Sequence, residues 1–124
     1  AFGTESRKYI RNSQIFHVRS GAGRAGAIEK ARAQGMKIVV DHSIAHPSEI
    51  KRQLDKLLSE SKESKFINIS DGFWNNVLKD CEEADVVLVN SDYVKDTFVA
   101  QGFAPDKIKV IHLGIDESFH SLKP

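Results

Sequence analysis

Short apolar runs alternate along this chain with longer amphipathic stretches. The runs typical of β-strands cover residues 15–18, 36–41, 85–90 and 108–113. The stretches between them carry strong helix formers or apolar residues at helical spacing. Strands that alternate with helices in this way predict an α/β domain, Rossmann-like and three-layered, with a mainly parallel sheet. We expect one more helix within residues 1–13, packed beside the first strand.

Several residues mark where the expected helices begin and end. Gly35 follows residues 27–34 and is expected to end that helix, because glycine is favoured just past a helix C-terminus. Pro47 suits the first turn of the next helix, where its missing N–H costs nothing. Ser91 can cap the helix after the third strand, and Gly102 is expected to end it.

Two of the expected helices carry an apolar stripe. The charged residues around the first stripe, such as Lys51 and Arg52, face away from it, as on a solvated helix surface. We expect the second stripe to be part of the core, with Cys81 as a small buried residue. The first stripe comprises Ile50, Leu54, Leu57 and Leu58; the second comprises Phe73, Trp74, Val77, Leu78 and Cys81.

Composition argues against several classes of protein but does not identify the function. The 124 residues carry a formal net charge of +1, which gives no reason to expect a nucleic-acid partner. Cys81 is the only cysteine, so no internal disulfide can form and a reducing, cytoplasmic compartment is expected. No apolar run approaches the roughly 20 residues that a transmembrane helix needs.

A glycine-rich segment follows the first strand and is the first candidate for chemistry. Gly21, Gly23 and Gly26 have the G-x-G-x-x-G spacing and precede a helix, while Asp41 ends the next strand. In dinucleotide-binding units such glycines let a pyrophosphate approach the backbone, and the acid binds a ribose. The pattern therefore leaves an NAD(P)- or FAD-binding oxidoreductase open. The alternative is a turn whose glycines serve only conformation and packing.

Two histidines after the second strand are the other candidate. His42 and His46 lie where ligands bind in open α/β sheets, beyond the carboxyl end of a strand. Histidine can exchange a proton near neutral pH, so a catalytic role is open. A metal site is disfavoured, because no cysteine or third histidine stands at a ligand spacing. A structural role, capping local backbone groups, is equally open.

The second half of the chain resembles a known family. Residues 84–95, then Gly102, then residues 106–116 and Phe119 resemble the end of the N-terminal domain of GT-B glycosyltransferases, of the group 1 or family 4 kind. In that family a buried strand ends in Ser, and a later strand runs into Gly-Val-Asp, here Gly114-Ile115-Asp116. Residues 15–47 are similar to the family's preceding strand–helix–strand unit.

The resemblance implies an enzyme that transfers a sugar from a nucleotide-sugar donor, with retention, to a glycan, lipid or small-molecule acceptor. Residues 1–113 would form part of the acceptor-side N-terminal domain, and residues 114–124 the linker to a donor-binding domain. The chain alone would then be inactive. The family works without an essential metal, so no cofactor is expected. The full protein is expected to be cytoplasmic, with peripheral contact at the inner membrane face open, and the chain alone to self-associate through an exposed sheet edge.

The resemblance also implies roles for particular residues. His42 falls where the family places a histidine that hydrogen-bonds at the reacting centre, with His46 as its rival. An acceptor would be met by a loop at the edge of the cleft, formed by Ser20, Gly21, Gly23 and Arg24. A non-catalytic α/β interaction domain stays open beside the glycosyltransferase and oxidoreductase hypotheses.

Overall fold

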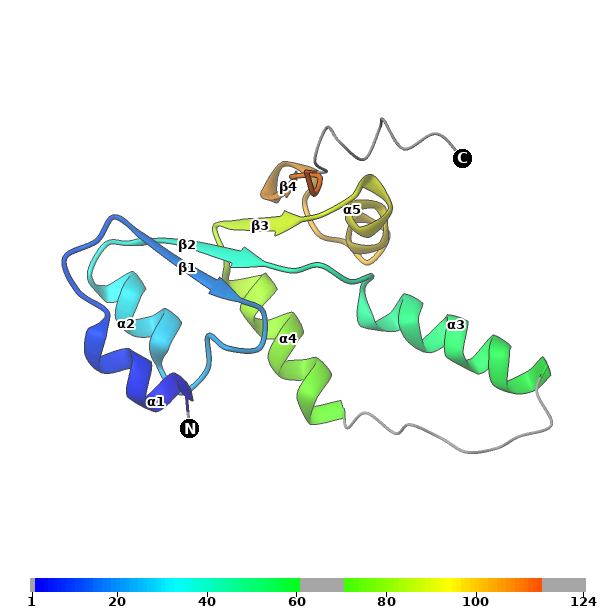
Figure 1. The fold of residues 1–124 in the computed structure, drawn as a ribbon, viewed down its shortest axis with the longest axis horizontal. Helices are drawn as coiled ribbons and strands as arrows, with labels where there is room; N and C mark the ends of the chain where they lie inside the picture. Colours follow the sequence, from blue (N-terminus) through cyan, green and yellow to red (C-terminus); the bar gives the residue numbers. More distant parts are fainter. Residues whose placement is uncertain (1, 61–70, 115–124) are drawn as a thin grey trace, which may run out of the picture.

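Four parallel strands form the centre of the molecule, which a computed structural model describes for residues 2–60 and 71–114 (Figure 1). The strands stand in the sheet in the order in which they occur in the chain. The Rossmann-like parallel α/β class expected from the sequence is therefore confirmed. The strands are β1 (Ile15–Arg19), β2 (Lys37–Asp41), β3 (Val86–Val89) and β4 (Ile108–Val110).

The helices occupy most of the positions that the sequence predicts. The 3-10 helices are η1 (Arg7–Tyr9) and η2 (Pro105–Lys107). Ser91 caps α5 as expected, since its Oγ accepts a hydrogen bond from the Val94 N–H at 3.3 Å. The α-helices are α1 (Phe2–Ser6), α2 (Ala27–Ala33), α3 (Pro47–Glu60), α4 (Asp71–Glu83) and α5 (Asp92–Val99). Of the described residues, no helix is both long and apolar enough to cross a membrane.

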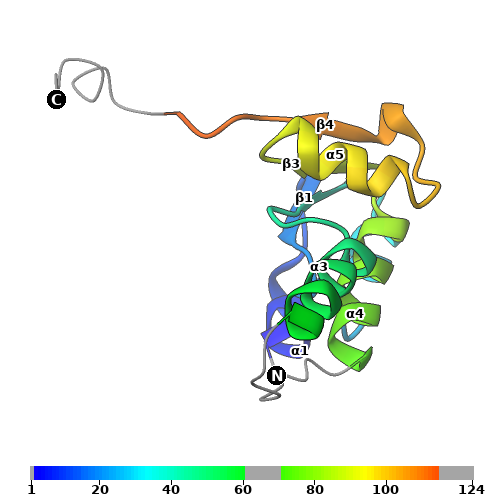
Figure 2. The same ribbon diagram turned by 90° about the vertical axis from the view of Figure 1, so that its right-hand side faces the viewer.

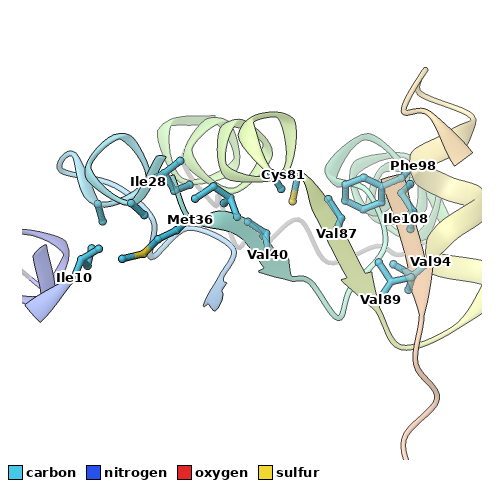
Figure 3. Close-up of a cluster of buried hydrophobic side chains, with 14 residues drawn as sticks. Ile10, Ile28, Met36, Val40, Cys81, Val87, Val89, Val94, Phe98 and Ile108 are labelled. Carbon is cyan, nitrogen blue, oxygen red and sulfur yellow. The ribbon is translucent and has the colours of Figure 1, made fainter. Parts of the chain in front are cut away.

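The described helices that pack on the sheet lie on one of its faces. Because each connection advances by one strand in the same direction, right-handed crossovers place α2, α4 and α5 on the same side. The core lies between them and this face of the sheet (Figure 3). Ile38, Val40, Val87 and Ile108 have essentially no exposed surface there and pack with Phe98. Burying such side chains stabilises the fold by roughly 1.5–3 kcal/mol each.

The other face of the sheet is only partly covered. β2 was expected to be buried on both faces, but its residues alternate between exposed or half-buried and fully buried. Val39 points to the opposite side from Ile38 and Val40 and is half-buried. A continuous apolar run predicts a strand with two covered faces, but it cannot say which chain segment covers the second face.

Both apolar stripes are buried less than expected. α3 extends away from the sheet (Figures 1 and 2), so Leu57 is 61 % exposed and Leu54 43 % exposed. In α4, Val77 and Cys81 are buried as expected, but Trp74 is only half-buried and Phe73 is 51 % exposed. The first turn of α4 reaches beyond the strands (Figure 1), so its aromatic residues have no sheet beneath them.

Two further expectations are wrong, and a third concerns residues that the structure does not describe. The helix expected within residues 1–13 is short, and α1 lies against α2 instead of β1. β4 ends at Val110 and not at residue 113, because β3 ends at Val89 and Ile111 makes the last hydrogen bond to it, at 2.8 Å. Residues 115–124, most of the expected linker, lie outside the described residues.

Candidate functional site

The carboxyl ends of the strands meet at one rim of the sheet. Asp41 is the register partner of Leu88, so the loops that follow β2 and β3 begin side by side. The Asn90 side-chain amide donates a hydrogen bond of 3.2 Å to the Ser43 carbonyl and so ties these two loops together. The strands are parallel and share this rim, as a ligand site of an open α/β sheet requires.

Asp80 of α4 holds the glycine-rich loop that follows β1. Its carboxylate is fully buried. One carboxylate oxygen accepts hydrogen bonds from the N–H groups of Gly21 and Gly23, at 2.7 and 2.9 Å. The other accepts two from the guanidinium of Arg24, one from Nε at 2.6 Å and one from Nη2. All four contacts are charge-assisted, which makes them stronger than hydrogen bonds between neutral groups.

The shape of this loop requires glycine at two of its positions. Gly21 has a φ of +87°, in the left-handed region that favours glycine. Gly23 lies so close to its neighbours that an added Cβ would come within 2.5 Å of Ile28 Cδ1 and 3.0 Å of Asp80 Cγ. The glycines therefore serve a turn and a close approach of the loop to α2 and α4.

This arrangement contradicts the dinucleotide hypothesis. The N–H groups of Gly21 and Gly23, which would bind a pyrophosphate, already bind the Asp80 carboxylate. A phosphate would have to displace a buried carboxylate and leave the Arg24 ion pair broken. The carboxylate of Asp41, which was expected to bind a ribose, forms an ion pair with Arg19, with 3.8 Å between Oδ2 and Nη1.

The same contacts bear on the expected acceptor loop. The donors of Gly21, Gly23 and Arg24 point to Asp80 and not to a ligand, while Ser20 is bonded to His42. That these four residues contact an acceptor stays a prediction. In the structure Asp80 joins Gly21, Gly23 and Arg24, and Ser20 joins this loop to His42.

His42 is the buried residue at the start of the loop after β2. Its side chain is 1 % exposed and packs edge-on against Phe98, with ring centroids 4.9 Å apart. Nδ1 shares a hydrogen bond of 2.8 Å with the hydroxyl of Ser20. Nε2 is buried and has no hydrogen-bond partner among the described residues, although backbone groups of Ile44 and Ala45 interact with the ring and oppose the lowering of its pKa. Burial lowers the pKa of His42 to about 4, so the ring is neutral at physiological pH.

His46 has a different environment. It is also buried and packs against Phe98 and Phe103, and burial lowers its pKa too. Its Nδ1 accepts a hydrogen bond of 3.2 Å from the N–H of Ser48, and its carbonyl accepts one of 3.1 Å from the N–H of Ile50. His46 therefore caps the N-terminus of α3, which is a structural role.

A shallow hollow of about 390 Å³ opens beside these loops, where the open face of the sheet meets the rim. Its lining combines polar and apolar side chains, and Arg19 bonds Ser43 across it at 2.6 Å. The polar residues are His17, Arg19, Asp41, Ser43 and Asn90; the apolar ones are Leu88, Val89, Ile111 and Leu113.

Two other kinds of chemistry find no support in this part of the chain. Within residues 2–60 and 71–114, no group of three or more His, Cys, Asp or Glu side chains is arranged to hold a metal ion. Burial raises the pKa of the Cys81 thiol to about 12, so this residue is not a thiolate nucleophile at neutral pH.

Sequence reasoning missed Asp80 and gave Asn90 no role. Asp80 had a usable signal, because this acid lies between Val77 and Cys81 on the buried side of a helix. A buried carboxylate requires partners, and a loop of glycine N–H groups can supply them. Asn90 gave a weaker signal, since a polar residue at a strand end is common.

Comparison with known proteins agrees with this geometry. The family described as Glycosyltransferase Family 4 matches residues 1–119. No curated protein and no solved structure matches the chain.

Proposed function

Because this chain belongs to glycosyltransferase family 4, we propose that it supplies one side of a site where a sugar passes from a nucleotide-sugar donor to an acceptor. The family match over residues 1–119 carries this proposal. The shared rim at the carboxyl ends of the strands supports it, since that is where open α/β sheets bind ligands. Residues 1–113 then belong to the acceptor-side domain, and the donor is held by residues outside this chain.

His42 is the residue that we assign to the reacting centre. It follows β2 at the rim, and its Nε2 is a buried nitrogen without a hydrogen-bond partner in the described part of the chain. A lowered pKa keeps the ring neutral, which suits a hydrogen bond to a sugar hydroxyl better than transfer of a proton. The residue is 1 % exposed, so a substrate reaches Nε2 only when the groups packed around the ring shift.

The loop of Ser20, Gly21, Gly23 and Arg24 then acts mainly by position. Asp80 fixes the loop, and the hydroxyl of Ser20 fixes the ring of His42 through Nδ1. Holding a substrate-binding group in one geometry lowers the barrier, because no order has to be gained during the reaction. An acceptor would contact the outer surface of this loop and the hollow beside Arg19.

The finer features of the activity follow from the family and remain proposals: transfer of a hexosyl unit with retention, a nucleotide sugar as donor, and no essential metal. Cys81 is a free, buried thiol, which fits a reducing compartment such as the cytoplasm.

The test is an assay of the full-length gene product that contains this sequence. It is incubated with a panel of nucleotide sugars and candidate acceptors, and the release of nucleoside diphosphate is measured. His42→Ala is expected to lower kcat/KM at least about tenfold, or roughly 1.4 kcal/mol of barrier. His46→Ala is expected to change stability more than turnover of the folded enzyme.

The matched control is His112→Ala, which removes an exposed histidine whose side chain is 70 % accessible. It should leave kcat/KM unchanged. Equal activity of His42→Ala and the wild-type protein would remove His42 from the reacting centre. No nucleoside diphosphate release with any donor would contradict the proposed activity itself.

A further inference from the structure

The short segment that joins β2 to α3 lies against the buried ring of His42. Backbone groups of Ile44 and Ala45 interact with this ring, Phe98 packs against it, and Ser20 is bonded to its Nδ1. Of these neighbours Ile44 is the most exposed, at 42 %, whereas Phe98 has no exposed surface. The solvent side of the ring is therefore the side of Ile44 and Ala45.

Ile44 and Ala45 have little hydrogen bonding of their own. Within residues 2–60 and 71–114, no hydrogen bond joins the backbone of either residue to another backbone group. The residues on either side of this pair are anchored instead. A short stretch of this kind can move while the surrounding fold stays in place, because few contacts have to be broken.

The anchor before the pair belongs to the sheet. The N–H of His42 donates a hydrogen bond of 2.8 Å to the carbonyl of Leu88. The side-chain amide of Asn90 donates one of 3.2 Å to the carbonyl of Ser43. Both contacts come from β3 or from the residue that follows it, so this end of the segment is held by the rim.

The anchor after the pair is a side chain of α5. The half-buried hydroxyl of Thr97 accepts a hydrogen bond of 2.9 Å from the N–H of His46 and donates one of 2.7 Å to the carbonyl of Val94. One turn earlier on α5, the hydroxyl of Tyr93 donates a hydrogen bond of 3.2 Å to the carboxylate of Glu49 in α3. The far end of the segment and the start of α3 are thus both held by α5.

This arrangement leads to an inference that rests on the proposed role of His42. We propose that Ile44 and Ala45 form a flap that opens to admit a substrate to Nε2, and that Thr97 is the positioning residue that keeps the flap closed. The hydrogen bond from His46 to Thr97 then sets the fraction of molecules with an open flap. Because a substrate binds only this fraction, the apparent dissociation constant is the intrinsic one divided by it.

The experiment measures access to the His42 ring in the full-length gene product that contains this sequence, without substrates. Diethyl pyrocarbonate acylates neutral imidazole nitrogens, and mass spectrometry of peptides gives the rate for each histidine. Burial lowers the pKa of His42 to about 4, so its ring is neutral at neutral pH and its rate depends on access. His112, with a side chain that is 70 % accessible, gives the rate of an open histidine.

A second label separates opening of the flap from unfolding. Cys81 has no exposed surface and lies in the core, so a thiol reagent reaches it only when the core opens. Opening of the flap alone is expected to raise the labelling rate of His42 and to leave that of Cys81 unchanged.

Thr97→Val removes the hydroxyl and keeps a side chain of similar size. It is expected to raise the labelling rate of His42 about fivefold, which corresponds to about 1 kcal/mol for one lost hydrogen bond. Thr97→Ser keeps the hydroxyl and should restore the wild-type rate. The matched control is Thr4→Val, which changes the other threonine of the chain, exposed on α1, and should leave the rate unchanged.

Ala45→Gly tests the flap without touching its anchor. Glycine gives the backbone more freedom, so this variant is also expected to raise the labelling rate of His42. It keeps the test decisive if Thr97→Val does not fold.

Three outcomes would overturn the proposal. The first is a wild-type labelling rate of His42 in both Thr97→Val and Ala45→Gly. The second is an equal rise in the labelling of Cys81, because the core would then open and not the flap. The third is a rate in Thr97→Ser as high as in Thr97→Val, since the hydroxyl would then not be the anchor. Labelling requires no sugar transfer, so this result and the outcome of the nucleoside diphosphate assay are independent.

Discussion

Two neighbouring loops at the rim of the sheet differ in whether their buried polar groups have hydrogen-bond partners. In the loop after β1, Gly21, Gly23 and Arg24 all donate to Asp80, which is fully buried and fully bonded. In the loop after β2, His42 is equally buried, yet its Nε2 has no partner within the described residues. The glycine-rich loop is thus a structural clamp, in which Asp80 holds Gly21, Gly23 and Arg24 in place. The loop after β2 contains the buried nitrogen that has no partner.

The contrast shows how to separate supporting residues from candidate reactive ones. A satisfied polar network stabilises a fold, whereas an unsatisfied buried group costs free energy and requires another explanation. Glycine spacing alone pointed to the first loop, because sequence shows which groups can donate but not which acceptor is near. The three predictions that follow test this contrast.

Asp80→Ala should have the largest effect. It leaves two amide N–H groups without their acceptor and Arg24 with only its 3.5 Å contact to Glu83, and breaking a buried pair in this way costs about 3–5 kcal/mol. Chemical denaturation measures the loss. Asp80→Asn keeps one carbonyl oxygen for the two amides and should lose less. If Asp80→Ala costs under about 1 kcal/mol, the clamp does not stabilise the fold.

The pH dependence of stability should reveal the buried, neutral ring of His42 in the loop after β2. His42 has a pKa of about 4 in the folded state against 6.5 in the unfolded chain, so the unfolded state binds more protons between these values. Stability should therefore be intact above pH 6.5 and fall by roughly 3 kcal/mol as the pH drops towards 4. Thermal unfolding between pH 4 and 8 measures this slope.

His42→Gln, which cannot titrate, should reduce the acid-side slope by at least about half. Part of the slope should remain, because burial also lowers the pKa of His46. His112→Ala is the control and should keep the full slope. An unchanged slope in His42→Gln would show that His42 is not the group that titrates.

Ser20→Ala should have the smallest effect on stability. It tests the contact between the two loops. It removes the hydroxyl that is hydrogen-bonded to Nδ1 of His42, which costs about 1 kcal/mol by the usual measure of one hydrogen bond. Denaturation measures the cost, and nuclear magnetic resonance of the imidazole follows the pKa of His42. Ser59→Ala, on the exposed surface of α3, should leave that pKa unchanged. An unaltered His42 resonance in Ser20→Ala would contradict the coupling of the loops.

The positions of most elements were predictable from local sequence. The β-prone runs became β1 to β4, although β4 is shorter, and Gly35, Pro47 and Ser91 lie at helix ends as expected. Periods of two and 3.6 residues, together with end-of-helix preferences, act over only a few residues. The candidate site was predicted less well: His42 and the glycine loop were found, but Asp80 was not.

The sequence by itself determined the order of strands and helices, and hence a parallel α/β domain. Only the tertiary structure decided that Gly21 meets Asp80, 59 positions away, and that His42 keeps a nitrogen without a partner. It also decided that α3 projects outward and that, among the described residues, one face of the sheet is only partly covered. Local preferences act between near neighbours in the chain, whereas burial and the pairing of polar groups depend on segments that only folding brings together.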